Sequence, residues 1–221
     1  KNLLKTGNEF PYGQIAESEA TECWDKANEM YDLKSLKKDI ETFNDSNKLF
    51  KKGISLMPVC FGISFTKTLM NQGRALVHVY TDGSIGVSTG AVEMGQGVNT
   101  KMLQVAAHVF SVNPSKIKVQ TTNTCRIANT SPSAASATSD GKCRAGEMAC
   151  IEILERLKKV AAEILTSKSS DVTFKNEIIC VNGKQTDLSW NSLVLTTYGK
   201  RISLSEHAHY TLPHIYFDGT I

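Results

Sequence analysis

The spacing of apolar residues along the chain switches several times between a helical and a strand period. The stretch 75–91, ALVHVYTDGSIGVSTGA, contains two apolar, β-rich runs joined by Asp82-Gly83. An Asp-Gly pair between two such runs is the strongest short-range sign of a β-hairpin, because both residues tolerate the positive φ of the tight turn. The second strand of this predicted hairpin leads directly into Gly90, so the next segment begins at the rim of a sheet.

A helix is predicted after the glycine-flanked turn Gly95-Gln96-Gly97. Apolar residues recur there at intervals of three and four, which is the helical period. The helix ends before Pro114, because proline cannot continue the hydrogen-bond ladder and restricts the residue that precedes it. The apolar positions of this predicted helix are Met102, Val105, Ala106 and Val109.

A long loop of small and hydroxyl-bearing residues, 121–141, follows a predicted strand from Lys116 to Thr122. Loops of this length inside a compact domain are usually functional. The loop leads into a long predicted helix from Arg144 to Ser167, so a hydroxyl-rich segment precedes the N-terminus of a second helix. The core positions predicted for this helix are Met148, Ile151, Leu154, Leu157, Ala161 and Ile164.

The first third of the chain is predicted to hold two core-facing helices and one strand. The first helix starts near Ser18, and the second runs from Leu33 to Phe43. A strand interrupted at Gly62 is predicted from Val59 to Phe65. The apolar stripe of the first helix consists of Cys23, Ala27, Met30 and Tyr31.

The last third of the chain repeats the hairpin signal. An Asn182-Gly183 turn joins two apolar runs, and the segment from Trp190 to Tyr198 suggests a short helix, while Pro213 to Phe217 is predicted as strand or coil. Helices and hairpins alternate without a regular βαβ rhythm, and both Asx-Gly turns require antiparallel pairs. We therefore predict an α+β fold, with antiparallel hairpins and a mixed sheet packed against long helices.

The composition of the chain mainly excludes classes of function. Lys plus Arg number 25 and Asp plus Glu number 22, and the resulting net charge of +3 gives no electrostatic case for binding nucleic acid or a membrane surface. No run approaches the roughly 20 consecutive apolar residues that cross a bilayer. Six cysteines without a CxxC pair argue against a zinc or iron–sulfur ligand set within the chain and favour reduced thiols in a cytoplasmic protein.

Because the chain starts at Lys1 and stops without a closing element, we expect a piece of a longer polypeptide.

The starts of the two central helices are candidates for binding an anion. A helix N-terminus collects unpaired backbone N–H groups and a positive dipole end, and glycines beside it let a ligand approach the main chain. The alternative is a tight turn that binds nothing. Two such segments in one chain favour a phosphate or another anionic ligand more than either segment does alone.

Four strings carry a resemblance to a known family. They are FGISFT at 61–66, ALVHVYTDGS at 75–84, EMGQG at 93–97 and NTSPSAASATSDG at 129–141. With these strings in this order, the chain resembles the molybdenum-cofactor-binding subunit of the xanthine dehydrogenase and aldehyde oxidase family. On this resemblance the whole of 1–221 is part of one molybdopterin-binding region. Its expected parts are a helical lead-in at 10–50, a core with the cofactor turns at 51–167, and a hairpin with a C-terminal segment at 168–221.

The resemblance implies a molybdenum hydroxylase of the xanthine dehydrogenase type. Its molybdopterin would oxidise a purine, xanthine or hypoxanthine, with oxygen derived from water. Electrons would leave through iron–sulfur centres and FAD on other domains or subunits. The implied partners are a purine-type substrate, the remaining molybdenum-binding polypeptide and those redox domains, in a dimer of the full assembly.

Residue by residue, the resemblance places Met94, Gly95 and Gln96 beside the metal and the pterin. Gln96 is the catalytic candidate, because a glutamine amide can donate to a metal-bound oxygen while it stays neutral. No side chain of the chain is implied as a metal ligand. A carboxylate at the end of a strand, such as Glu93, is expected to be a structural acceptor rather than a general base.

Two further groups of residues follow from the same resemblance. Ala135, Ser136 and Thr138 match a second loop, whose N–H and hydroxyl groups would hold the phosphate or the pterin edge of the cofactor. Phe65 matches a ring that stacks on a flat substrate, and Thr66 would follow it at hydrogen-bonding distance.

The sequence also lacks part of the family pattern. The Gly-Glu-Pro-Pro string that carries the catalytic glutamate of the family does not occur in these residues, nor does the Phe-Arg-Gly-Phe-Gly motif. We therefore expect the chain alone to be inactive toward purines. Two alternatives stay open: a phosphate- or nucleotide-binding module without redox chemistry, and a structural subunit that has lost its site.

Overall fold

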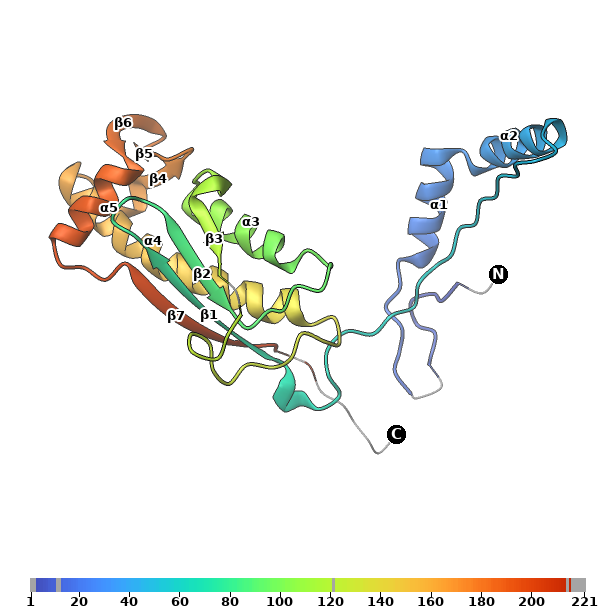
Figure 1. The fold of residues 1–221 in the computed structure, drawn as a ribbon, viewed down its shortest axis with the longest axis horizontal. Helices are drawn as coiled ribbons and strands as arrows, with labels where there is room; N and C mark the ends of the chain where they lie inside the picture. Colours follow the sequence, from blue (N-terminus) through green and yellow to red (C-terminus); the bar gives the residue numbers. More distant parts are fainter. Residues whose placement is uncertain (1–2, 11–12, 121, 214, 216–221) are drawn as a thin grey trace. The chain divides into compact units, whose positions relative to one another are not determined.

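The computed structural model describes residues 3–10, 13–120, 122–213 and 215 (Figure 1). They form two compact units, the first within 1–62 and the second within 63–217. All residues predicted for the site belong to the second unit. None of the helices in the described ranges is long and apolar enough to cross a membrane.

The second unit is built on a four-stranded mixed sheet with the order β3-β2-β1-β7. β1 (Gln72–Val79) and β2 (Ile85–Thr89) form the predicted hairpin. β7 (Ser205–Thr211) pairs antiparallel with β1, and β3 (Ile117–Val119) pairs parallel with β2. The hairpin and the mixed sheet are thus confirmed. β7 was not predicted, because its SEHAHYT sequence lacks the apolar alternation of a half-buried strand.

Two helices cover one face of this sheet (Figure 1). α3 (Val98–Phe110) crosses from β2 to its parallel neighbour β3, and α4 (Arg144–Ile164) packs along β1 and β7. Alternate residues of β1 point into this layer, and Ala75 and Val77 are fully buried there. In the register of the hairpin Ala75 lies opposite Thr89, so the chain leaves β2 beside the start of β1.

The buried face of α4 is rotated from the predicted one. Leu157 and Ala161 are buried as expected, but Ile151 and Ile164 are exposed. The α4 residues with the deepest burial are Ala145, Ala149, Cys150, Ile153, Leu157, Val160 and Ala161. Ala145, Ala149 and Cys150 were left out of the predicted stripe, yet they are buried, because small side chains let the helix approach the sheet closely. The largest apolar side chains of a helix therefore do not always mark its core face.

A second sheet, with the order β4-β5-β6, packs beside the first and is antiparallel throughout. The strands are β4 (Val172–Lys175), β5 (Ile178–Val181) and β6 (Lys184–Ser189), and α5 (Trp190–Gly199) follows them. The predicted Asn-Gly turn connects β5 to β6, and the predicted last helix is α5. The short helical turns among the described residues are Thr68–Met70, Pro114–Lys116, Ser139–Cys143 (η3) and Ser169–Asp171.

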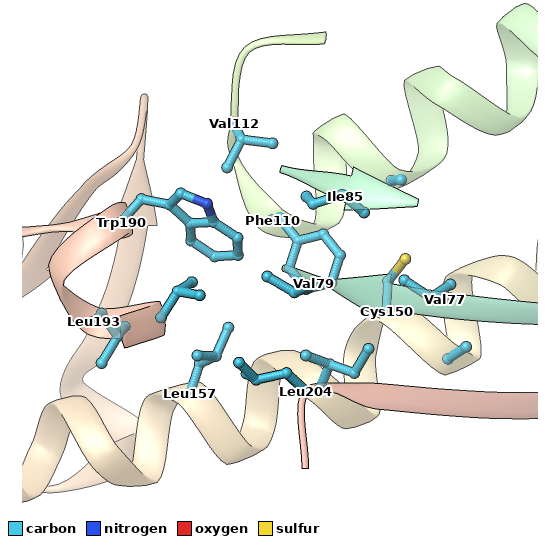
Figure 2. Close-up of a cluster of buried hydrophobic side chains, with 14 of the residues drawn as sticks. Val77, Val79, Ile85, Phe110, Val112, Cys150, Leu157, Trp190, Leu193 and Leu204 are labelled. Atoms are coloured by element: carbon cyan, nitrogen blue, oxygen red, sulfur yellow. The ribbon is translucent and has the colours of Figure 1, made fainter. Parts of the chain in front are cut away.

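Trp190 joins the second sheet to the core of the first (Figure 2). Its ring lies 5.5 Å from that of Phe110, between ring centroids, and its Nε1 donates to Gly83 O at 2.8 Å. Leu157 and Leu193 pack in the same cluster. One continuous core therefore extends from the four-stranded sheet to α5, at the end of β1 that lies away from Gly90.

The first unit contains α1 (Ala20–Tyr31) and α2 (Leu33–Ser46). Both were predicted, but as core-facing helices, and neither contains a buried residue. Met30 and Tyr31 of the expected stripe are 65% and 61% exposed. The apolar period of α1 therefore predicted a helix correctly and a buried face wrongly, because periodicity says which residues share a face and not what covers it.

The strand predicted from Val59 to Phe65 does not form. The segment 51–63 has no strand partner among the described residues, and Ser64 has a φ of 75°, outside the β region. A strand is defined by its pairing, which alternation alone cannot supply. Of the predicted strand or coil at 213–217, residues 214, 216 and 217 lie outside the described residues.

Candidate functional site

The turn that leads from β2 to α3 is organised by Glu93. Its carboxylate accepts the backbone N–H groups of Gly97 at 2.9 Å, Gly95 at 3.0 Å and Asn99 at 3.0 Å. These hydrogen bonds, from Asn99 first, lower the pKa of Glu93 below its usual 4.5. The N-terminus of α3, which the sequence suggested as an anion cradle, is thus capped by a carboxylate of the chain itself.

Gln96 folds its side chain back over the same turn. Its Oε1 accepts from Met94 N at 2.6 Å, and its Nε2 donates to Val92 O at 2.8 Å. One of the two Nε2 hydrogens stays free, and within the described part of the chain the backbone N–H of Gln96 has no acceptor either. Gln96 therefore offers two unused donors at an exposed position.

Space for a ligand exists on the outside of this turn. Gly95 and Gly97 have φ values of 98° and 77°, and a Cβ placed on either would meet no atom within 4 Å. Glycine is required there by the backbone conformation and not by crowding. Met94 is 67% exposed, so the side chains of the turn also leave its surface open.

The second predicted loop carries backbone strain at the predicted residues. Ala135 and Ser136 both have a φ of 52°, and left-handed conformations cost roughly 1–2 kcal/mol for a residue with a Cβ. No acceptor for either backbone N–H is found among the described residues. Thr138 comes just before the π-helical turn η3, which leads into α4. Successive free N–H groups in a turn form a concave donor surface of the kind that binds anions.

Phe65 is held by a buried side chain that the sequence analysis did not single out. Asn71, which is 5% exposed, accepts from Phe65 N at 2.8 Å and donates to Phe65 O at 2.9 Å. The neighbouring Ser64 N donates to Ala135 O at 2.8 Å. Phe65 is thereby fixed beside the second loop, and Thr66 is exposed.

The turn and the second loop are also joined directly. Val92 N donates to Ser133 Oγ at 2.8 Å. Where the chain leaves β2, a Cβ on Gly90 would lie 2.1 Å from Thr130 Cγ2, so the two segments touch there and only glycine fits. The structure thus brings together three segments that are distant in sequence: 64–66, 92–97 and 133–138.

Several donors of this site have no partner. Three buried side-chain oxygens of the described residues lack a hydrogen bond, and two of them, Ser64 Oγ and Thr130 Oγ1, lie in these loops. The free donors of Gln96 and of the strained loop are neutral groups that suit an oxygen-rich ligand. No cluster of three His, Cys, Asp or Glu side chains that could hold a metal ion occurs in the described ranges.

Sequence reasoning missed two buried polar residues of the site, Asn71 and Lys142. Lys142 Nζ contacts Gly90 O, Ser131 O and Ser133 Oγ, in both of the joined segments. A lysine within a run of small residues was a possible signal, whereas nothing near Asn71 marked it.

A cavity of about 770 Å³ opens at the end of β1 that lies away from Gly90. It is lined in part by His78 and Tyr198, and none of the predicted site residues lines it.

Comparison with known proteins identifies a family for this chain. Residues 26–220 match the family described as "Molybdopterin cofactor-binding domain". The chain is 38% identical over 216 residues to the xanthine dehydrogenase/oxidase of Mus musculus, an alignment that covers 97% of this chain and 15% of that protein. It is 41% identical over 182 residues to xanthine dehydrogenase 1 of Arabidopsis thaliana, covering 82% of this chain and 12% of that protein.

The chain thus spans only 12% to 15% of the length of these two relatives. Among solved structures, the reconstituted CO dehydrogenase from Oligotropha carboxidovorans matches with a TM-score of 0.70 and 18% identity, over 93% of this chain and 28% of that chain. Quinoline 2-oxidoreductase from Pseudomonas putida 86 matches with a TM-score of 0.64 and 20% identity, over 94% and 28%. At these identities the likeness concerns the fold, and it confirms the predicted α+β class.

Proposed function

Because this chain belongs to the molybdopterin cofactor-binding domain family, we propose that it forms one wall of the cofactor site in a molybdenum hydroxylase that oxidises purines. The proposed substrate is xanthine or hypoxanthine, with iron–sulfur and FAD centres on other domains or subunits and a dimer as the full assembly. The free thiols Cys23, Cys60 and Cys125 support a cytoplasmic location for it. Substrate and partners rest on the xanthine dehydrogenases that the chain is similar to.

The convergence of three segments carries this proposal. Gln96, Ala135 and Phe65 come from separate parts of the sequence, and the Val92–Ser133 and Ser64–Ala135 hydrogen bonds connect those parts. Each segment presents donors without partners or an aromatic ring. A single glycine turn before a helix would not carry the same weight, because such turns also occur where nothing binds.

In this proposal molybdopterin, when bound, supplies the redox chemistry, and the chain orients it. The free Nε2 hydrogen and backbone N–H of Gln96 donate to oxygen atoms of the bound group. The N–H groups of Ala135 and Ser136, with the Thr138 hydroxyl, hold the phosphate or the pterin edge. Phe65 stacks against the flat substrate, and Thr66 lies beside it.

The arrangement at Glu93 disfavours the non-redox alternative. A phosphate-binding module of the kind considered would use the amides at the starts of both central helices, α3 and α4. At the start of α3, the amides of Gly95, Gly97 and Asn99 already donate to the Glu93 carboxylate. A second anion there would meet a negative charge of the protein itself.

Replacing Gln96 tests the proposal. In the full protein that carries this chain, we expect Gln96→Ala to lower purine turnover by about 100-fold, the usual effect of removing a donor to a reacting oxygen. Gln104→Ala, an exposed glutamine on α3, is the matched control and should keep turnover within about two-fold of wild type. Elemental analysis of both proteins reports their molybdenum content.

Three results contradict the proposal. The first is a native protein without molybdenum or releasable pterin. The second is a Gln96→Ala protein that turns over purines like the Gln104→Ala control. The isolated 221-residue chain is expected to be inactive toward purines. Measurable turnover by that chain would also contradict the proposal that it holds only one wall of the site.

A further inference from the structure

Lys142 is the most deeply buried charged side chain of the described residues. It is 1% exposed. Its Nζ donates to Ser131 O at 2.7 Å, to Gly90 O at 3.0 Å and to Ser133 Oγ at 3.4 Å. An ammonium group has three donors, so these three contacts use all of them.

This ammonium is buried without an opposite charge. The ion pairs of the described residues do not include Lys142, and its three acceptors are two carbonyls and a hydroxyl. Burial alone lowers the pKa of Lys142 from 10.5 to about 8. A buried, unpaired cation opposes folding, so its place in the core calls for a reason other than stability.

The acceptors of Lys142 lie on the two segments of the site. Gly90 lies two residues before the start of the 92–97 turn, whereas Ser131 and Ser133 belong to the loop that reaches Ala135. Ser133 Oγ also accepts from Val92 N, and Ser131 Oγ donates to Gln72 O at 2.6 Å in β1. One ammonium therefore connects the end of β2, the turn, the loop and the start of β1.

Packing alone does not fix this junction. Thr130 contacts Gly90 closely, yet its Oγ1 has no hydrogen-bond partner. Gly90 is buried and Ser131 and Ser133 are partly buried, so apolar contacts cannot replace the hydrogen bonds of their polar groups. Without the ammonium, two carbonyl oxygens and one hydroxyl would lose a buried donor at the base of both loops.

We propose that Lys142 is a positioning residue of the cofactor site, whose buried charge holds the 92–97 turn and the 131–138 loop at the separation that bound molybdopterin requires. The inference rests on the function proposed above. Lys142 does not touch the cofactor in this account. It acts through Gly90 and Ser133, on which the positions of Gln96 and Ala135 depend.

The test compares Lys142→Met with a core variant of equal stability. Methionine keeps an unbranched side chain that is one atom shorter, and it removes the charge and the donors of the ammonium group. Ile153→Val and Leu157→Ala, both in the buried face of α4, provide controls, and the one whose thermal midpoint falls by the same amount is chosen. Ser133→Ala is a milder second variant, because it removes one acceptor and the Val92 bond while leaving the lysine in place.

The first readout is hydrogen exchange of the full protein after removal of cofactor. We expect the amide of Val92 to exchange about ten-fold faster or more in Lys142→Met, and also in Ser133→Ala, which removes the acceptor of that amide directly, while the α4 amides match the control. This readout does not depend on cofactor binding. The second is molybdenum content after reconstitution, expected to fall about ten-fold in Lys142→Met relative to the control, as for other residues that support a metal site.

The outcomes separate this inference from the proposed function. If wild type holds no molybdenum, the function fails, and hydrogen exchange alone still decides whether Lys142 joins the two segments. If wild type holds molybdenum but Lys142→Met matches the control in exchange or in molybdenum content, Lys142 is only a tolerated core residue and the inference is wrong.

Discussion

At the scale of single residues, the site depends on how the turn after β2 satisfies its own polar groups. A glycine-rich turn before a helix predicted a place for an anion, and Glu93 supplies that anion from within the chain. Gln96 uses one hydrogen of its amide and the amide oxygen inside the turn and keeps the other hydrogen free. The turn is therefore held by its own hydrogen bonds before a ligand binds. The donors that stay free belong to Gln96.

Replacing Glu93 should weaken this turn in a manner that depends on pH. Hydrogen bonds lower the pKa of Glu93 in the folded chain, so its stabilising effect is present above the usual pKa of 4.5 and is lost as the pH falls through the lowered value. We expect Glu93→Gln to reduce the thermal midpoint at pH 7 and to differ less from wild type as the pH falls below 4.5. The exposed Glu152→Gln on α4 serves as control. Equal midpoints of Glu93→Gln and wild type at pH 7 would show that the carboxylate does not cap α3.

At the scale of elements, two loops and the residues before β1 form the site, and side chains hold them in place. The apolar pattern predicted a strand from Val59 to Phe65, but Ser64 adopts a positive φ and Asn71 binds both backbone polar groups of Phe65. Phe65 is thereby presented by a fixed loop instead of a strand. Such side-chain hydrogen bonds replace the ladder that a strand would have provided.

Asn71→Ala should release Phe65. The change removes two hydrogen bonds from a buried position, so we expect a loss of about 1–3 kcal/mol in unfolding free energy and a KM for purines raised about ten-fold, with a smaller effect on kcat. Asn44→Ala is the control, because Asn44 makes the same pair of bonds to Lys52 N and O, at 2.8 and 3.0 Å, within the first unit. Steady-state kinetics and thermal unfolding measure both effects. A KM equal to that of Asn44→Ala would mean that Phe65 needs no such support, or that it does not bind the substrate.

At the scale of the whole second unit, the two sheets share one core through Trp190. Its ring packs against Phe110 and its Nε1 bonds Gly83 O in the turn of the first hairpin, at the opposite end of β1 from the site. The scaffold and the site are thus at different ends of the same sheet. A substitution of Trp190 should therefore lower the stability of the fold without a direct effect on the free donors of Gln96.

Trp190→Phe tests this separation. Phenylalanine keeps most of the ring contact but leaves Gly83 O without its donor, so we expect a loss of about 1–3 kcal/mol, measured by chemical denaturation. Tyr198→Phe in the same helix is 62% exposed and should change stability by less than about 0.5 kcal/mol. Molybdenum content at temperatures where Trp190→Phe is folded should equal that of wild type. A loss of molybdenum from the folded variant would contradict the separation.

The sequence by itself determined the local parts of this protein. The two Asx-Gly hairpins, the helices after Gly97 and before Ser167, and the α+β class follow from periodicity and turn chemistry, which act between neighbours in the chain. The MGQG and serine-rich strings identified the family for the same reason, since a cofactor loop is a short run of residues.

Only the tertiary structure decided how those parts are used. It placed Lys142 in the core, Asn71 on Phe65 and Glu93 on the start of α3, and it left α1 without a buried face. Each of these depends on groups brought together by folding, whose hydrogen bonds and burial no local period encodes. The strand predicted at 59–65 failed for that reason too: a strand exists only when another strand pairs with it.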